Sequence, residues 1–186
     1  GMLSGKSSNP EPIDKQARLI FEREFITKQL NTGLTLVDAL IPIALGQREL
    51  ILGDARSGKT SFLTTVVANQ KNSGIVCIYA TIGKPASEVR GIIDVLKANN
   101  ALSYTTVIAS SSSDPPPLIY ITPQTALTLA EYFQKQGKDV LVVLDDMGVH
   151  AKIYREISLL SEIIPGREAY PGDIFYQHSH LLERAG

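Results

Sequence analysis

The sequence predicts an α/β domain in which helices cover both faces of a mainly parallel sheet. Segments with strand-like and helix-like patterns alternate along most of the chain, as they do in such folds. Residues 53–60 (GDARSGKT) fit the phosphate-binding pattern G-x-x-x-x-G-K-[ST]. Residues 140–144 (VLVVL) are wholly apolar, which is typical of a strand buried on both faces of a parallel sheet.

Each element is predicted from its own pattern and from the residues that flank it. The predicted strands are residues 48–52, 75–80, 105–109 and 140–144. The predicted helices are residues 60–70, 87–99, 123–136, 153–164 and 174–184. Prolines 115–117 fit a helix entrance better than a ligand for a proline-binding module, and Gly137 fits a helix C-cap.

The loop between the first predicted strand and helix is expected to hold a nucleotide. Its glycines permit backbone angles that point N–H groups at an anion, and the following helix adds its positive end. Lys59 would reach the phosphates and the Thr60 hydroxyl would bind Mg²⁺. The expected nucleotide-binding residues are Gly53, Asp54, Ala55, Arg56, Ser57, Gly58, Lys59, Thr60 and Ser61. The Arg56 side chain would either touch a phosphate or be solvated.

Two aspartates follow the predicted strand 140–144, at the sheet edge where ligands of α/β folds bind. Asp145 is therefore expected to support Mg²⁺, through a water molecule, beside the phosphate loop. The alternative is that the pair caps a helix beginning near Val149, and Asp146 suits this role better. His150, His178 and His180 form no metal-ligand pattern, so we expect surface or capping histidines.

Bulk properties fit one globular domain. The chain has 186 residues, of which 44% are hydrophobic and 20% charged, with net charge −1. This charge gives no general attraction to nucleic acid, and no apolar run approaches the roughly 18 residues of a membrane span, so neither nucleic-acid binding nor membrane insertion is expected. Cys77 lies in an apolar segment and is expected to be buried and inert. Residues 1–12 are expected to be a flexible leader with a tag scar (GM), and residues 13–186 the domain.

Longer stretches than the loop carry a family resemblance. They are residues 32–34 (TGL), 37–43 (VDALIPI), 46–50 (GQREL), 165–176 (PGREAYPGDIFY), 178–179 (HS) and 181–184 (LLER). Together they resemble the nucleotide-binding domain of the F-type ATP synthase alpha subunit over residues 31–185. The resemblance implies a P-loop NTPase fold of the RecA-like, layered α/β/α type, here incomplete relative to the family.

The resemblance also implies a function. The chain would be a non-catalytic, regulatory and structural subunit that binds Mg²⁺ with ATP or ADP in a ring. Its partners would be the catalytic beta-type subunit and the central stalk. It would be cytoplasmic and peripheral to the membrane through the complex. The residues expected to face the rotating shaft are Arg167, Glu168, Ala169, Tyr170, Pro171, Gly172 and Asp173.

Some residues depart from the family pattern. Catalytic members carry a glutamate after the second strand and alpha chains a glutamine, whereas this sequence has Lys84. A lysine is cationic near neutral pH and cannot act as a base there unless it is strongly desolvated, so hydrolysis of ATP by the isolated chain is not expected. Glu88 is the nearest carboxylate, one helical turn further on. Ala55 and Arg56 also replace the arginine and glutamine usual in alpha chains.

The chain is also shorter than the family pattern. The N-terminal β-barrel, the adenine pocket, the arginine finger and the strand that usually lies between the loop strand and strand 140–144 are absent from the sequence. We expect either a piece of a longer protein or a degenerate paralogue. The sheet would then be repaired by residues 21–30, by closure of the gap or by a neighbouring chain. Two alternative functions stay open, namely a free-standing RecA-like ATPase and a pseudo-subunit that acts only in assembly.

Overall fold

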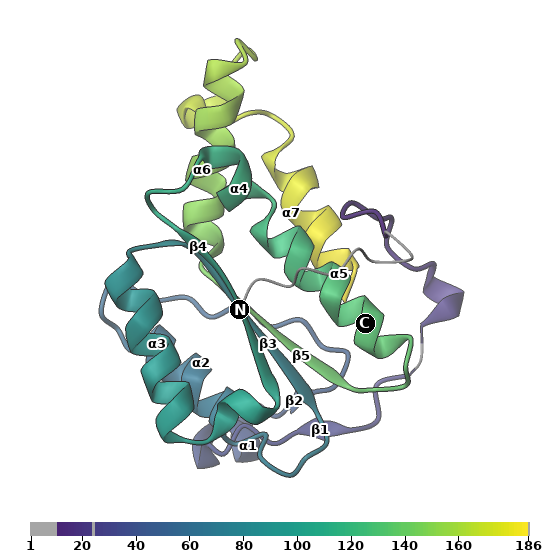
Figure 1. The fold of residues 1–186 in the computed structure, drawn as a ribbon. Helices are drawn as coiled ribbons and strands as arrows, with labels where there is room; N and C mark the ends of the chain where they lie inside the picture. The colour runs from purple at the N-terminus through teal and green to yellow at the C-terminus, as the bar shows by residue number, and fades with distance from the viewer. Residues whose placement is uncertain (1–10, 24, 186) are drawn as a thin grey trace.

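The computed structural model describes residues 11–23 and 25–185, and its centre is a parallel three-stranded sheet (Figure 1). The strand order is β4-β3-β5, formed by β3 (Val76–Lys84), β4 (Thr105–Ser111) and β5 (Val140–Asp145). Tyr79 of β3 lies opposite Val107 of β4 and Val143 of β5. Since parallel strands end at one edge, Lys84 and Asp145 are delivered to the same side of the domain.

Helices and short strands surround this sheet. The helices are α1 (Thr35–Leu40), α2 (Lys59–Ala68), α3 (Ala86–Ala98), α4 (Pro116–Tyr120), α5 (Thr122–Gln134), α6 (Met147–Leu160) and α7 (Ile174–Glu183). Two short strands, β1 (Gln29–Leu30) and β2 (Ile43–Ala44), pair antiparallel. Single 3₁₀ turns lie at Ile20–Glu22, Ala101–Ser103 and Arg167–Ala169.

The alternation of side chains along β3 separates two hydrophobic cores. Cys77 and Tyr79 point to one face and are buried against α2 and α3. Ile78 and Ala80 point to the other face and are buried against α5. The layered α/β/α architecture with a parallel sheet is therefore confirmed, and Cys77 is buried as predicted.

Most predicted elements are observed close to their expected bounds. Residues 153–160 of the predicted helix 153–164 lie in α6, which starts earlier, at Met147, and ends at Leu160, four residues before the predicted end. Pro116 and Pro117 stand in the first turn of α4, so the helix-entrance prediction is confirmed. Gly137 lies three residues beyond the last residue of α5 with φ +75°, and the N–H groups of Gly137 and Lys138 donate to the carbonyls of Gln134 and Phe133, so its role in closing the helix is confirmed.

The predicted strand 48–52 is wrong. These residues form no regular structure, and the side chains of Leu50 and Leu52 are 70% and 81% exposed. Among the described residues, no strand pairs with the outer edge of β5, so segment 48–52 forms no hydrogen-bonded ladder with the sheet. The segment 21–30 does not repair the sheet either, because β1 pairs with β2 instead.

The segment before the loop is tied to α2 by polar contacts. The Asp38 carboxylate accepts hydrogen bonds from the Thr32 hydroxyl at 2.7 Å, from the Thr32 N–H at 2.9 Å and from the Gly33 N–H at 3.0 Å. These donors lower the pKa of Asp38. At the end of α2, the side-chain amides of Asn69 and Gln70 donate to the carbonyls of Thr32 and Asn31. The motif TGL…VD thus anchors the chain against the C-terminal end of α2.

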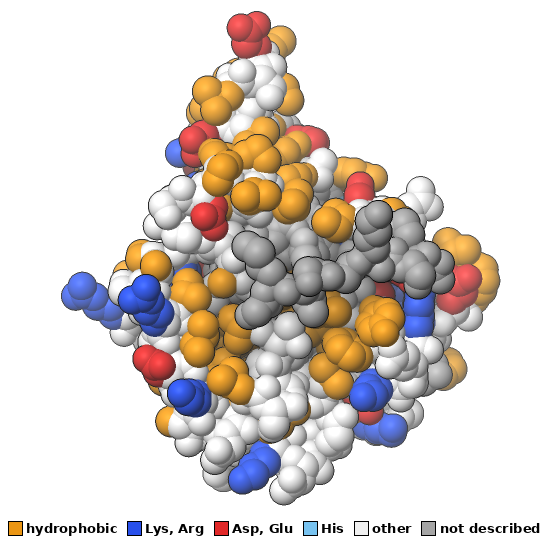
Figure 2. Space-filling model, viewed as in Figure 1, with side chains coloured by type: hydrophobic (Ala, Val, Ile, Leu, Met, Phe, Trp, Pro, Cys, Tyr) orange, Lys and Arg blue, Asp and Glu red, His pale blue; other side chains and the backbone are white. Residues whose placement is uncertain are grey.

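Hydrophobic side chains gather over α4 and α6 in the upper part of the space-filling view (Figure 2). The exposed apolar residues at the end of α6 and just beyond it are Leu159, Leu160, Ile163 and Ile164. Figure 1 shows that this end of α6 projects beyond the sheet. Within residues 11–23 and 25–185, none of the helices has the length and apolar character needed to cross a membrane. Residues 1–10 of the predicted leader lie outside the described part.

Candidate functional site

The residues expected to hold phosphate form a turn directly before α2. Gly58 is the N-cap of α2 with φ +96°, a conformation that side chains disfavour. A Cβ atom at Gly53 would lie 2.4 Å from Ser57 Oγ, so only glycine fits there without a shift. The Ser57 N–H donates to the Asp54 carbonyl at 3.2 Å and closes the turn. Both pattern glycines therefore have a local structural reason.

Lys59 is the first residue of α2, and its side chain reaches back to the turn. Its ammonium donates to the carbonyls of Gly53 at 2.5 Å and Asp54 at 2.7 Å. Contact with a phosphate would require Lys59 to exchange these hydrogen bonds for phosphate oxygens. Such an exchange is favourable because hydrogen bonds between two charged groups are stronger than those to neutral carbonyls.

Asp145 stands at the end of β5 and is 3% exposed. Its Oδ2 atom accepts a hydrogen bond from the Tyr79 hydroxyl at 2.9 Å and one from the Thr60 hydroxyl at 3.3 Å. Burial, followed by the charge of Asp145, raises the pKa of Tyr79, so its hydroxyl stays a neutral donor. The structure thus brings Thr60 and Asp145 together, as the sequence predicted.

Lys84 approaches the other oxygen of the same carboxylate. Its Nζ atom is 3.1 Å from Asp145 Oδ1 and 3.7 Å from a carboxylate oxygen of Glu88. Sequence reasoning noted Lys84 as a departure but missed this ion pair and the contact of Tyr79. The signal was available, because Lys84 and Asp145 both end strands that meet at one edge of a parallel sheet.

The donor set beside the loop fits a magnesium ion. Mg²⁺ prefers oxygen ligands and is commonly held by one or two carboxylates together with phosphate and water. The Thr60 hydroxyl and the Asp145 carboxylate supply such oxygens next to the N-terminus of α2. No group of three or more His, Cys, Asp or Glu side chains arranged for a metal occurs among the residues that the structure describes.

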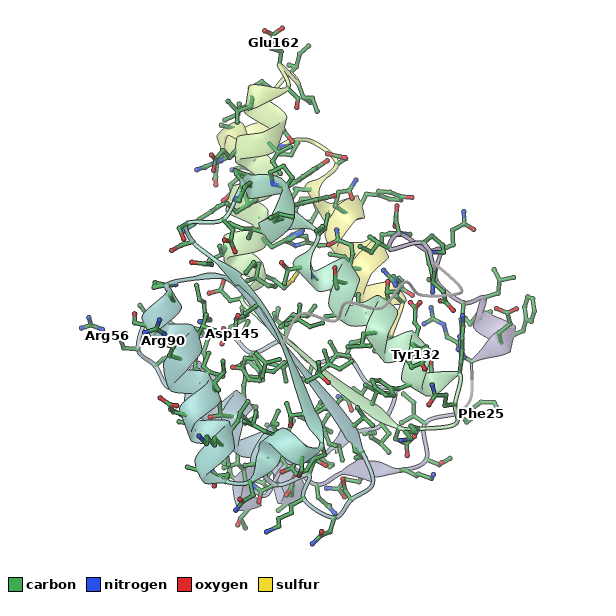
Figure 3. All side chains as sticks on the ribbon, in the orientation of Figure 1. Phe25, Arg56, Arg90, Tyr132, Asp145 and Glu162 are labelled. Carbon is green, nitrogen blue, oxygen red and sulfur yellow. The ribbon has the colours of Figure 1, made fainter. Side chains whose placement is uncertain are left out.

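Four further residues of the predicted site are at the surface. Asp54, Ala55, Arg56 and Ser61 are exposed. Figure 3 shows Arg56 at the outside of the molecule, away from Asp145.

Asp146 is the N-cap of α6, where its Oδ1 atom accepts a hydrogen bond from the Val149 N–H at 2.7 Å. The capping role predicted for Asp146 is therefore confirmed.

The segment 167–173 lies between α6 and α7. Arg155 of α6 stacks on the Tyr170 ring at 4.9 Å, and the Tyr154 hydroxyl donates to Asp173 at 2.6 Å. This hydrogen bond lowers the pKa of Asp173, whereas burial and the same bond raise the pKa of Tyr154 to about 12. In the described part of the chain, no hydrogen bond or ion pair joins this segment to residues 53–61.

The prediction of a surface or capping role is wrong for His150, which is fully buried. Its Nδ1 atom lies 3.1 Å from Nε2 of His178, and its Nε2 atom lies 3.1 Å from the Tyr120 carbonyl. The ring also stacks on that of Tyr120 at 5.1 Å. A lone histidine in a helical pattern carries no sequence signal that separates a buried partner from an exposed one.

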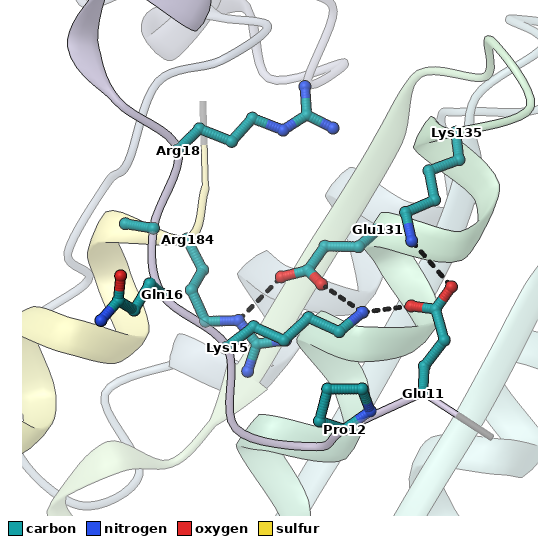
Figure 4. A pocket seen from close by; sticks show the side chains of 9 residues that line it. Glu11, Pro12, Lys15, Gln16, Arg18, Glu131, Lys135 and Arg184 are labelled. Atoms are coloured by element: carbon teal, nitrogen blue, oxygen red, sulfur yellow. Dashed lines mark hydrogen bonds and ion pairs between the residues drawn. The ribbon is translucent and has the colours of Figure 1, made fainter.

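A hollow of about 290 Å³ lies on the α5 side of the sheet, opposite the face that α2 covers (Figure 4). Its walls are joined by a chain of ion pairs that runs from Lys135 to Glu11, Lys15, Glu131 and Arg184. Burial raises the pKa of Glu131, but hydrogen bonds from Arg184 and Lys15 outweigh it, so the pKa is lowered. These five lining side chains pair with one another, and the pairs fix the segment around Glu11 and Lys15 against α5 and α7.

A parallel sheet between helix layers, with a phosphate-loop sequence at the N-terminus of α2 and a strand-terminal aspartate beside it, defines a P-loop α/β domain. The chain belongs to the ATP synthase alpha/beta family: residues 33–186 match its nucleotide-binding domain. The partial RecA-like fold agrees with this membership.

Individual relatives are ATP synthase alpha subunits. The chain is 52% identical over 179 residues to ATP synthase subunit alpha 2 of Nitrosospira multiformis, covering 96% of this chain and 35% of that protein. It is 51% identical over 180 residues to subunit alpha 1 of Psychromonas ingrahamii, covering 97% and 35%. It is 47% identical over 185 residues to the alpha subunit of Limosilactobacillus reuteri, covering 100% and 36%. The chain thus spans about a third of the length of these relatives.

Proposed function

We propose that this chain binds Mg²⁺ with ATP or ADP, as a non-catalytic subunit, or part of one, of a rotary proton-translocating ATP synthase. The observation that carries the proposal is the contact of 3.3 Å between the Thr60 hydroxyl and the Asp145 carboxylate at the N-terminus of α2. Residues 53–61 would hold the phosphates, and Thr60 would bind the metal directly while Asp145 supports it through water. A bound Mg²⁺ would neutralise phosphate charge.

The residues around Asp145 support a non-catalytic role. Hydrolysis needs a group that orients the attacking water. Lys84 stands where a catalytic member would have a carboxylate, and it forms an ion pair with Asp145. Glu88 is the nearest other carboxylate, but its side chain is 58% exposed and faces the same ammonium. Neither side chain is placed to act as a base.

The similarity to alpha subunits supports a place in a ring with a beta-type catalytic subunit around a central stalk. On this proposal, residues 167–173 face the stalk. The exposed apolar side chains at the end of α6, such as Leu160 and Ile164, would be covered by a neighbouring subunit, since patches of this kind mark protein interfaces. The chain would then be cytoplasmic and peripheral to the membrane through the complex.

Calorimetry with Mg-ATP, together with a phosphate-release assay, tests the proposal. We expect binding with a Kd in the micromolar range or tighter and no turnover. Lys59→Ala should weaken binding about tenfold to a hundredfold, because it removes a charged hydrogen-bond donor. Lys71→Ala is the matched control, since Lys71 is an exposed lysine beyond the end of α2.

Two other outcomes would replace the proposal. Turnover of ATP that Lys59→Ala abolishes would favour a free-standing RecA-like ATPase. Absence of binding at millimolar Mg-ATP by a folded chain would favour a pseudo-subunit that acts only in assembly.

A further inference from the structure

The ammonium of Lys84 is already placed against the carboxylate that would support a metal. Lys84 ends β3 beyond a register shift between Thr81 and Lys84. Its Nζ atom is 3.1 Å from Asp145 Oδ1, and the two side chains are only 12% and 4% exposed. The pair with Glu88 is longer, at 3.7 Å, and that side chain is largely in solvent. The negative charge of Asp145 is therefore balanced by Lys84 in a place that solvent screens weakly.

Both oxygens of Asp145 have protein partners. Oδ1 faces the ammonium of Lys84, and Oδ2 accepts from the hydroxyls of Tyr79 and Thr60. A carboxylate that is neutralised in this way attracts a divalent cation less strongly. A metal beside Thr60 would also be repelled by a cation that contacts the same carboxylate. The site can accept Mg²⁺, but it already contains one positive charge of its own.

The same charge can serve a polyphosphate. Lys84 and Thr60 contact one carboxylate from two sides, and Thr60 stands in the first turn of α2, where the helix end attracts anions. Lysine binds phosphate as a point charge on a flexible stem. Rotation of the Lys84 side chain away from Asp145 would bring its ammonium toward a phosphate held at that helix end.

We propose that the ammonium of Lys84 supplies part of the positive charge that Mg²⁺ would otherwise supply to a bound polyphosphate. This site would then bind nucleoside di- and triphosphates with little dependence on divalent metal. The inference rests on the proposed function of residues 53–61 as a polyphosphate site. It adds a specificity: the free nucleotide, and not only its magnesium complex, is a ligand of this chain.

Calorimetry with ADP and ATP in excess EDTA and in excess Mg²⁺ tests the inference directly on the wild-type chain. We expect the two Kd values to agree within about threefold, because metal and ammonium compete for one carboxylate. In Lys84→Gln, which keeps a polar side chain without charge, Mg²⁺ should tighten binding about tenfold or more. Lys84→Arg keeps the charge and should resemble the wild type, as should Glu88→Gln, which removes only the exposed partner.

Electron paramagnetic resonance in the presence of ADP gives a second measurement, the affinity for Mn²⁺. This affinity would not change on substitution of Lys84 if the ion pair were only structural. We expect Lys84→Gln to bind Mn²⁺ more tightly than the wild type. Equal affinities for Mn²⁺ in the two proteins would overturn the inference.

The outcomes separate the two proposals. If Mg²⁺ lowers the Kd for nucleotide as much in the wild type as in Lys84→Gln, the inference is wrong and the proposed function stands. Absence of nucleotide binding in both EDTA and Mg²⁺, by a chain that circular dichroism shows to be folded, would sink the proposed function and the inference with it. The comparison of EDTA with Mg²⁺ in the wild type decides the matter even if Lys84→Gln fails to fold.

Discussion

Buried His150 and its half-buried partner His178 predict a loss of stability in mild acid. His150 is 0% exposed, and both of its ring nitrogens have partners. Nε2 faces a carbonyl, that of Tyr120, so Nε2 carries the proton, and Nδ1 accepts from Nε2–H of His178. Protonation of Nδ1 would place two N–H groups against each other. Tyr120 stacks on the His150 ring, and Tyr154 stacks on Tyr120. Burial raises the pKa of both tyrosines, that of Tyr154 to about 12, so neither supplies a charge.

The magnitude follows from the pKa of His150. Burial, and then the neighbouring His178, lower this pKa from 6.5 to about 4, and burial also lowers that of His178. Between these two pH values the unfolded chain binds a proton at His150 and the folded chain does not. The free energy of unfolding therefore falls as the pH drops below 6.5, and the loss is complete near pH 4. From His150 alone, the free energy of unfolding at pH 5 is about 2 kcal/mol lower than at pH 7. For a chain of this size the melting temperature falls by about 4–8 °C.

Urea unfolding followed by circular dichroism at the two pH values measures this difference. The chain has three histidines, and carboxyl groups titrate mainly below this window, so histidines dominate the change. His150→Phe should flatten the pH dependence, although the variant loses the hydrogen bond to Tyr120. His180→Gln is the control, because the ring nitrogen of His180 contacts the largely exposed Asp14, a weak surface pair, so the substitution should change the dependence little. Equal wild-type stability at both pH values, or an undiminished drop in His150→Phe, would refute the reasoning.

Two further predictions concern buried groups away from the loop. Arg184→Ala should lower the free energy of unfolding by about 2 kcal/mol, because the partly buried carboxylate of Glu131 loses its 2.7 Å partner and keeps only Lys15, at 3.1 Å. Arg23→Ala, which breaks the more exposed pair with Glu183, should cost at most about 1 kcal/mol, and equal losses in urea titrations would contradict this account. Burial raises the pKa of the Cys77 thiol to about 12, so it should react with a thiol reagent only as fast as the chain unfolds. Rapid labelling of Cys77 in the folded chain at pH 8 would contradict the burial of this thiol in the core.

Local patterns predicted the elements that pack on the central sheet, because β3, α3 and α5 carry their burial pattern in their own residues. The segment 48–52 (RELIL) ends in three apolar residues and still forms no strand. A strand is stabilised by the neighbour with which it pairs, and that neighbour is not encoded in the segment itself. The contact of Thr60 with Asp145 was predictable from topology alone, whereas the burial of His150 depends on how α4, α6 and α7 meet.

The two halves of the candidate site are held by different means, and this shapes how a ligand would bind. Thr60, Tyr79 and Asp145 stand on α2, β3 and β5, which share the larger hydrophobic core. Residues 53–57 are exposed, follow a segment without a ladder, and are held by Lys59 and one turn hydrogen bond. The half proposed to support a metal is thus preorganised, whereas the loop would have to reorganise for Lys59 to contact a phosphate. Affinity for a polyphosphate is therefore reduced by the cost of ordering the loop, and a contact that pairs 48–52 into the sheet should strengthen it.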